Sequence, residues 1–120
     1  ESLDQVKKII SKTFPEFSNN LKICKGDIRD YSFLENIFHE AIENEKEIIS
    51  VIHFAGFKSV KESITAPLLY WDNNVNGSIS LLKCMSKFNC NNIVFSSSAA
   101  VYGDVQNLPI LENEKINPNI

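Results

Sequence analysis

The sequence predicts an α/β fold, specifically part of a doubly wound parallel sheet with three strands and intervening helices. Helical and strand patterns alternate along the chain, as they do in parallel sheets built with crossover helices. The six residues 48–53 are rich in Ile and Val and include no proline or charged residue, which is typical of a strand buried on both faces. The helical stretches repeat apolar residues every three or four positions.

The first helix is expected from residue 2 to residue 14. Ser2 and Gln5 have the spacing of a capping box, in which two side chains satisfy backbone N–H groups of the first turn. Pro15 then ends the helix. A short strand is expected over residues 21–24, and Gly26 lies in the turn that follows it. The apolar face of the first helix consists of Leu3, Val6, Ile9, Ile10 and Phe14.

The second helix is expected to follow Asp30, whose carboxylate can cap its first turn. Residues 43–47 are mostly charged and predict a solvated connection into the central strand, which ends at the small residues Ala55 and Gly56. The apolar stripe of the second helix consists of Leu34, Ile37, Phe38, Ala41 and Ile42.

The third helix is expected as one element over residues 67–88, beginning at Pro67. Gly77 in its middle costs about 1 kcal/mol of helix propensity, which indicates that a neighbouring backbone packs closely there. A third strand is expected over residues 92–95, and the chain becomes irregular beyond residue 103. The apolar stripe of this helix consists of Leu68, Trp71, Val75, Ile79, Leu82 and Met85.

Composition argues against several classes of function. The 120 residues fit one domain of modest size, and a net charge of −3 without a basic cluster argues against nucleic-acid binding. No apolar run approaches the roughly 20 residues that cross a bilayer, and no signal-peptide pattern opens the chain, so no membrane partner is expected. Cys24, Cys84 and Cys90 form no CxxC pair, which favours buried free thiols in the cytoplasm, and no metal-ligand cluster is present.

Polar residues gather where the expected strands end, which is where open α/β sheets bind ligands. Lys58 is the first cation after Ala55 and Gly56, which predicts backbone lying close to an anionic ligand or, alternatively, an ordinary tight turn. The hydroxyls of residues 96–98 can share a proton with a substrate hydroxyl, or they cap the end of the strand.

Further candidates follow the first strand and lie on the long helix. Asp27 either accepts hydrogen bonds from a ligand amine or begins a turn. Asn73 and Asn74 are poor helix formers that either hold the strand ends, hold a ligand, or belong to a solvated face. His53 is expected to be a core histidine with satisfied hydrogen bonds.

Two features of a complete dinucleotide site are absent from the chain. The glycines are too far apart for a G-x-G-x-x-G loop, and none of the tyrosines is followed four residues later by a lysine. Three apolar strands would also leave sheet edges open, which is a liability for a folded domain. We therefore expect strands to be missing on at least one side.

Four segments carry a family resemblance: GDIRD (26–30), VIHFAGFKSVKES (51–63), PLLYWDNNVNGS (67–78) and IVFSSSAAVYGD (93–104). Together they resemble the UDP-glucose 4-epimerases, a family of the extended short-chain dehydrogenase/reductases. The HFAGFK run separates this family from relatives that read closer to HLAA. Ala99 and Ala100 stand where a resemblance to dTDP-glucose 4,6-dehydratases would call for acidic residues.

The resemblance implies a set of site residues. Asp27 and Ile28 would read the adenine ring of NAD, and Ser98 would hydrogen-bond the 4-hydroxyl of the sugar beside a catalytic tyrosine. The remaining implied contacts are Phe54, Ala55, Gly56, Lys58 and Asn73 to the cofactor, and Lys58, Ser96 and Ser97 to the substrate.

The resemblance also implies the activity of the parent enzyme. Bound NAD would take a hydride from C4 of the hexose and return it to the opposite face, which interconverts UDP-galactose and UDP-glucose. The implied partners are a UDP-sugar and a second copy of the chain in a cytoplasmic homodimer. Residues 1–120 would be a fragment of the NAD-binding Rossmann domain, inactive alone, with the glycine-rich unit before Glu1 and the Tyr-x-x-x-Lys segment after Ile120. The alternatives are another UDP-sugar 4-epimerase, acting on an N-acetylhexosamine or a uronic acid, and a non-catalytic NAD(P)-binding regulatory protein of the same fold.

Overall fold

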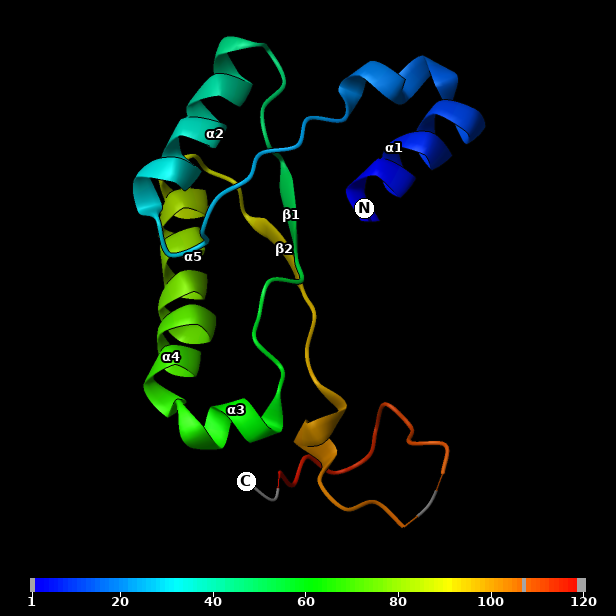
Figure 1. Ribbon diagram of the computed structural model, residues 1–120, viewed down its shortest axis with the longest axis vertical. Helices are drawn as coiled ribbons and strands as arrows, with labels where there is room; N and C mark the ends of the chain where they lie inside the picture. The colour runs from blue at the N-terminus through cyan, green and yellow to red at the C-terminus, as the bar shows by residue number, and fades with distance from the viewer. Residues whose placement is uncertain (1, 107, 119–120) are drawn as a thin grey trace.

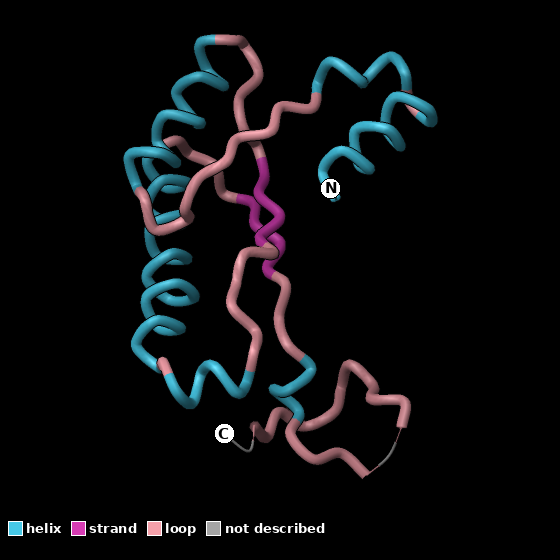
Figure 2. The backbone as a smooth tube through the Cα atoms, viewed as in Figure 1, coloured by secondary structure: helices cyan, strands magenta, loops and turns pink. Residues whose placement is uncertain are grey.

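The computed structural model describes residues 2–106 and 108–118, and its centre is a two-stranded parallel sheet (Figure 1). Strands β1 (Ser50–His53) and β2 (Asn92–Phe95) pair in register, with Ser50 opposite Asn92 and His53 opposite Phe95. Because the strands are parallel, the loops that follow them leave the same edge of the sheet, as Figure 2 shows. The predictions of an α/β fold with a parallel sheet and of a strand over residues 92–95 are confirmed.

Helices make up most of the remaining regular structure. They are α1 (Ser2–Thr13), α2 (Tyr31–Glu43), α3 (Val60–Thr65), α4 (Pro67–Trp71) and α5 (Gly77–Lys87), with 3-10 segments η1 (Pro15–Asn20) and η3 (Ala99–Tyr102) and a π-helical segment η2 (Asp72–Asn76). Asp30 caps α2 as predicted, because its carboxylate accepts the Phe33 N–H at 2.9 Å. The short helix α3 was not predicted; Ser59 caps it by accepting the Glu62 N–H. The capping box at Ser2 stays a prediction, since that side chain lies outside those described.

The hydrophobic core lies between α2, α5 and one face of the sheet. Val51 of β1 and Phe88 at the end of α5 pack against it. Its buried members are Leu34, Phe38, Leu81, Cys84, Met85 and Cys90. Cys84 and Cys90 are therefore buried free thiols as expected, whereas Cys24 is exposed.

The prediction of a strand over residues 21–24 is wrong. A strand exists only where its backbone N–H and C=O groups pair with a neighbour, and among the described residues this segment has no such partner. The segment therefore runs as irregular chain from Leu21 toward the turn at Asp27. β1 is also shorter than expected, because pairing begins at Ser50 rather than at Ile48.

The expectation that the central strand is buried on both faces is also wrong. Helices α2 and α5 lie on one side of the strands (Figure 1), and they cover the face that carries Val51 and His53. On the other face Ile52 lies opposite Val94, and these side chains are 64% and 62% exposed. An uninterrupted apolar strand thus indicates that both of its faces tend to be buried, but the described residues cover only one face of this sheet.

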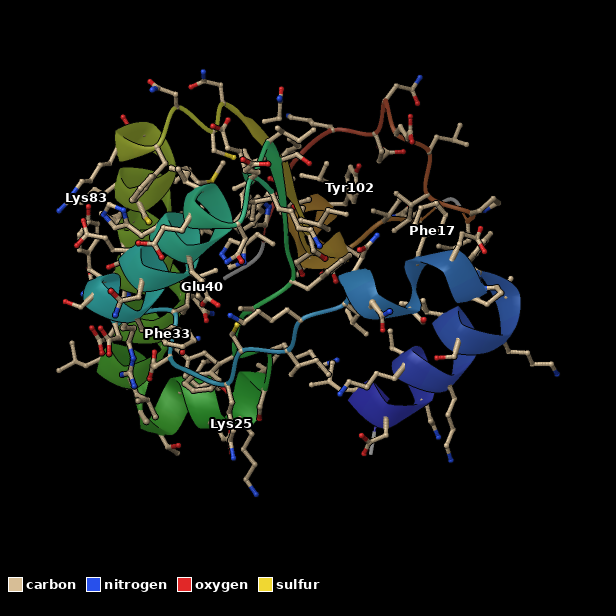
Figure 3. The ribbon with its side chains drawn as sticks, turned by 90° about the horizontal axis from the view of Figure 1, so that it is seen from above. Phe17, Lys25, Phe33, Glu40, Lys83 and Tyr102 are labelled. Atoms are coloured by element: carbon tan, nitrogen blue, oxygen red, sulfur yellow. The ribbon has the colours of Figure 1, made fainter. Side chains whose placement is uncertain are left out.

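Helix α1 lies on the other side of the strands from α2 and α5, and the described element that it contacts is η1 (Figures 1 and 3). Its predicted apolar face is largely exposed, with Leu3 at 51% and Ile9 at 61%. The radius of gyration is 17.7 Å, whereas a compact domain of this length is expected near about 14 Å. The fold is an open arrangement of layers. Across the described ranges, no helix is both long and apolar enough to span a bilayer.

The predicted long helix is continuous from Pro67 to Lys87, but its middle turn is π-helical. The flanking residues Trp71 and Gly77 keep right-handed helical dihedrals, and the Gly77 N–H bonds the Asp72 C=O five residues back. Single π turns inside α-helices are frequent at functional sites. This turn carries the Asn-Asn pair singled out from the sequence.

Candidate functional site

The β1 loop, defined as residues 54–59, is held in place by side chains that bond to its backbone. The first of these is His53, which is 5% exposed. Its Nδ1 accepts the Ala55 N–H at 3.2 Å, and its Nε2 lies 3.0 Å from Ser78 Oγ in α5. The expectation of a satisfied core histidine is confirmed. Burial lowers the pKa of His53 below its ordinary range, which favours the neutral ring.

Asn74 holds the middle of the β1 loop with both ends of its amide. Oδ1 accepts the Phe57 N–H at 2.8 Å, and Nδ2 donates to the Phe57 C=O at 2.9 Å. Asn73 Nδ2 donates to Asn74 Oδ1 at 2.9 Å. Asn73 thereby holds the amide of Asn74 in place within the π turn. The interpretation that an Asn of this pair holds the strand end is confirmed for Asn74.

Tyr70 anchors the last residue of the β1 loop to α4. Its hydroxyl accepts the Ser59 N–H at 3.1 Å and donates to Glu62 Oε2 at 2.8 Å. Its ring centroid lies 5.4 Å from that of Phe57. Burial, supported by the Glu62 carboxylate, raises the pKa of Tyr70, so the hydroxyl keeps its proton. Gly56 therefore lies in a loop whose backbone is fixed before it and after it.

A second loop, residues 26–29, packs against the same long helix. A Cβ built on Gly26 would collide with the ring of Phe33, so the ring covers this glycine. A Cβ built on Gly77 would lie 2.6 Å from Cγ2 of Ile28. The close approach predicted at Gly77 is confirmed, although the neighbour is the Ile28 side chain rather than a backbone.

Arg29 ties this second loop to the helix through two carboxylates. Its Nη2 donates to Asp27 Oδ2 at 2.7 Å, and its Nη1 donates to Asp72 Oδ2 at 2.6 Å. The hydrogen bonds from Arg29 lower the pKa of Asp27 to about 2, and bonds from Asn76 and Arg29 lower that of Asp72. The Asp27 C=O also accepts the Asp30 N–H, so Asp27 begins a turn, as one of its two interpretations had it.

A cavity of about 470 Å³ lies between the two loops, beyond the carboxyl end of β1. Its lining is formed by Gly26, Asp27, Ile28, Arg29, Phe33, Leu34, Ala55, Gly56, Phe57 and Asn73. Of the site residues predicted from sequence, the structure brings together Asp27, Ile28, Ala55, Gly56 and Asn73. They come from three separate stretches of the chain, and the helix α4–η2–α5 holds both loops.

The other predicted site residues lie outside this lining. Phe54 is 76% exposed, and Lys58 and the serines of residues 96–98 are exposed as well. The Ser96 N–H donates to the His53 C=O at 3.0 Å, so the serines start at the same sheet edge as the β1 loop. Ser98 Oγ accepts the Ala100 N–H at 3.2 Å, so it satisfies a backbone group as one interpretation had it, but it caps η3 rather than the end of the strand.

The lining suits binding better than proton transfer. A Cβ on Gly56 would meet Asn74 Oδ1 at 3.6 Å, an ordinary contact, and Gly56 itself lines the cavity. Phe33 reaches from α2 toward the second loop and offers a ring (Figure 3), while the ion-paired Asp27 and Arg29 offer charged acceptors and donors. The volume is in the range of small-molecule sites. Within residues 2–106 and 108–118, no three His, Cys, Asp or Glu side chains gather as metal ligands.

Sequence reasoning missed Arg29, Phe33, Phe57 and Tyr70 as parts of this arrangement. A signal for Arg29 was present, because an arginine flanked by Asp27 and Asp30 has carboxylates within reach. No local pattern points to Tyr70, whose backbone partner lies eleven positions earlier in the chain.

Comparisons with known proteins support the family resemblance carried by the four sequence segments. The family model described as GDP-mannose 4,6 dehydratase matches residues 1–120. UDP-glucose 4-epimerase 2 of Oryza sativa subsp. japonica is 47% identical over 104 residues, and UDP-glucose 4-epimerase 2 of Arabidopsis thaliana is 43% identical over 116 residues. These matches cover 87% and 97% of this chain but 24% and 31% of the relatives, so the chain spans about a quarter to a third of their length.

A solved structure shows the same arrangement of the backbone. The UDP-glucose 4-epimerase from Bifidobacterium longum, in complex with NAD+ and UDP, is 44% identical with a TM-score of 0.66. The match covers 78% of this chain and 27% of that one. The predicted Rossmann-type fold is confirmed for the part of the chain that is matched.

Proposed function

Because the chain belongs to the GDP-mannose 4,6 dehydratase family, we propose that its cavity holds the adenosine end of NAD in a UDP-glucose 4-epimerase. The proposed reaction interconverts UDP-galactose and UDP-glucose through transient oxidation at C4 of the hexose. The observation that carries this proposal is the cavity itself. It gathers Asp27, Ile28, Ala55, Gly56 and Asn73 beyond the carboxyl end of a parallel strand, where sheets of this type bind nucleotides.

The residues of this chain bind and orient, and NAD, when bound, supplies the hydride chemistry. Ala55 and Gly56 leave the backbone open to the dinucleotide, and Asn73 reaches the same space. Lys58, at the far side of the same loop, offsets phosphate charge. Ser98 Oγ already accepts the Ala100 N–H, so its own proton stays free to donate to the 4-hydroxyl of the sugar.

We propose that this segment acts within a longer protein, as a fragment of an NAD-binding domain. The chain holds neither a G-x-G-x-x-G turn nor a Tyr-x-x-x-Lys pair, so both would come from the rest of that protein. Residues 1–120 by themselves are expected to leave UDP-galactose unchanged in a coupled assay.

The test is a coupled assay of UDP-galactose conversion in the full-length protein with Ser98 replaced. Ser98→Ala removes the hydroxyl and the cap of η3, while Ser98→Asn keeps a capping acceptor but no hydroxyl. Both are expected to lower kcat by about 100-fold or more, the scale of a positioned proton-sharing group, and Ser98→Thr should retain most of it. Ser32→Ala, at an exposed position of α2 outside the cavity lining, is the matched control.

Each alternative function has its own outcome in this assay. Faster turnover of a UDP-N-acetylhexosamine or a UDP-uronic acid would assign the protein to another UDP-sugar 4-epimerase. Tight NAD binding with no turnover of any UDP-sugar would make it a non-catalytic regulatory protein of the same fold. Absence of NAD binding by the full-length protein would refute the proposed cofactor.

We also propose that a second copy of the protein packs against the long helix. Its outer side carries exposed apolar residues at helical spacing, with Leu68 at 82%, Trp71 at 64% and Leu82 at 49%. A charge at the centre of this stripe, Trp71→Glu, is expected to convert a dimer to a monomer in sedimentation equilibrium. Lys61→Glu on α3 is the control, and a wild-type protein that sediments as a monomer would refute the assembly.

A further inference from the structure

We infer that His53 is a positioning residue whose proton state sets the backbone of the β1 loop and thereby the affinity for the dinucleotide. The inference rests on the proposed function and deepens it. His53 lies outside the cavity lining and acts through the residues that form it.

The hydrogen bonds of His53 require one tautomer of the neutral ring. Nδ1 accepts the Ala55 N–H at 3.2 Å, so this nitrogen carries a lone pair and no proton. Ser78 Oγ donates its single proton to the Asn74 C=O at 2.6 Å, so toward the imidazole it can only accept. The Nε2–H of His53 is therefore the donor in the 3.0 Å contact with Ser78.

These bonds connect His53, at the end of β1, to Ala55 and to Phe57, the residues on either side of Gly56. On one side His53 fixes Ala55 directly. On the other side the chain of bonds runs through Ser78 to Asn74, whose amide grips the N–H and the C=O of Phe57. Gly56 lies between the two fixed residues and lines the cavity. One imidazole thus contributes to both anchors of the short stretch that faces the cavity.

Protonation of the ring breaks this arrangement. Imidazolium carries a proton on Nδ1, which then faces the Ala55 N–H, donor against donor. The groups around the ring are the Ala55 N–H from the loop, Ser78 Oγ from α5 and the Phe95 ring from β2, which lies edge-on with centroids 5.1 Å apart. None of them is charged between pH 5 and 8, and burial is what lowers the pKa of His53. In acid the loop must therefore move away from its binding position, or the ring must turn out of the core.

The test compares His53→Asn with His53→Gln in the full-length protein. An Asn side chain places its amide oxygen near the Nδ1 position, so it keeps an acceptor for Ala55 and does not titrate. A Gln side chain places its amide nitrogen near the Nε2 position, so it keeps a donor for Ser78 and loses the acceptor for Ala55. Isothermal titration calorimetry measures the dissociation constant for NAD from pH 5 to 8. His39→Asn is the matched control, because His39 is exposed on α2.

The affinity of the wild type for NAD is expected to decrease at pH values below the pKa of His53. The decrease is at most tenfold per pH unit, because one proton is linked to binding. His53→Asn is expected to bind within about threefold of wild type at pH 7.5 and to lose this acid dependence. His53→Gln is expected to bind about tenfold more weakly at pH 7.5, the scale of one lost hydrogen bond to a buried donor, and to be flat as well. The control should keep the wild-type profile.

A cofactor-free measurement keeps this inference separate from the proposed function. Two-bond nitrogen–proton spectra of the wild-type imidazole should show the Nε2–H tautomer, and exchange of the Ala55 amide should speed up in acid in wild type but not in His53→Asn. An Nδ1–H tautomer, or a His53→Asn variant that keeps the wild-type acid dependence of NAD binding, overturns the inference. If wild type binds no NAD at pH 7.5, the proposed function fails, and the tautomer and amide exchange decide whether His53 sets the loop.

Discussion

Replacing Gly77 with alanine tests how tightly the loop of residues 26–29 packs on the long helix. In a helix interior this change gains about 1 kcal/mol of propensity. Here the new Cβ would lie 2.6 Å from Cγ2 of Ile28 and 3.5 Å from Cγ of Arg29. Forcing an extra methyl group into a packed contact costs about 1–3 kcal/mol. The balance predicts a loss of about 0–2 kcal/mol in the free energy of unfolding, where an unobstructed helix glycine would show a gain.

A double-mutant cycle separates the two contributions. Ile28→Ala removes the methyl group that Cβ would meet, so in that background Gly77→Ala is expected to raise the free energy of unfolding by about 1 kcal/mol. Urea denaturation of wild type, both single variants and the double variant then gives an interaction energy of about 1–3 kcal/mol between the two positions. A Gly77→Ala variant that stabilises the wild-type background by about 1 kcal/mol would refute the reasoning, because Ile28 would then move aside without cost.

Three further predictions concern the groups that hold the loops. Asn74→Leu loses both bonds to Phe57 and should lower the free energy of unfolding by about 1–3 kcal/mol, with Asn74→Asp, which keeps the acceptor, losing less in the same urea titration. Arg29→Met should raise the pKa of Asp27 from about 2 toward about 4, because its main hydrogen-bond donor is gone; an NMR titration that leaves it near 2 would contradict this. The free energy of unfolding of wild type should fall as the pH drops below about 6.5, because His53 stays neutral in the folded state while the unfolded chain binds the proton first, and His53→Asn should remove this slope.

Much of the fold could be predicted because apolar periodicity reports which side of an element is covered. The stripe on α2 and the strand β2 lie where the pattern placed them. The same reasoning failed for residues 21–24, because periodicity describes burial and a strand also needs a hydrogen-bonding neighbour. It failed again for the second face of β1, since residues such as Ile52 indicate a need for cover but not whether the cover lies in this stretch of chain.

The part of the site that could be predicted follows from one rule: ligands of parallel sheets bind beyond the carboxyl ends of the strands. Ala55 and Gly56 follow a strand directly, so their place at its carboxyl end needed no knowledge of packing. The bonds that hold them there join positions distant in sequence: Phe57 to Asn74 spans 17 positions and Arg29 to Asp72 spans 43. Nothing in the local sequence encodes such partners, and no residue pattern marks the π turn that presents the Asn side chains.

The two walls of the cavity are bonded to one helical turn rather than to each other. Asp72 accepts a hydrogen bond from Arg29 in one wall. Asn74, two positions later, forms hydrogen bonds with the backbone of Phe57 in the other wall. Successive residues of a regular α-helix diverge around its axis, so side chains two apart point to opposite sides. The side chains of Asp72 and Asn74 therefore leave η2 on different sides, and Asn73, the residue between them, lines the cavity. The spacing of the two loops therefore depends on η2, because its side chains bond to both of them.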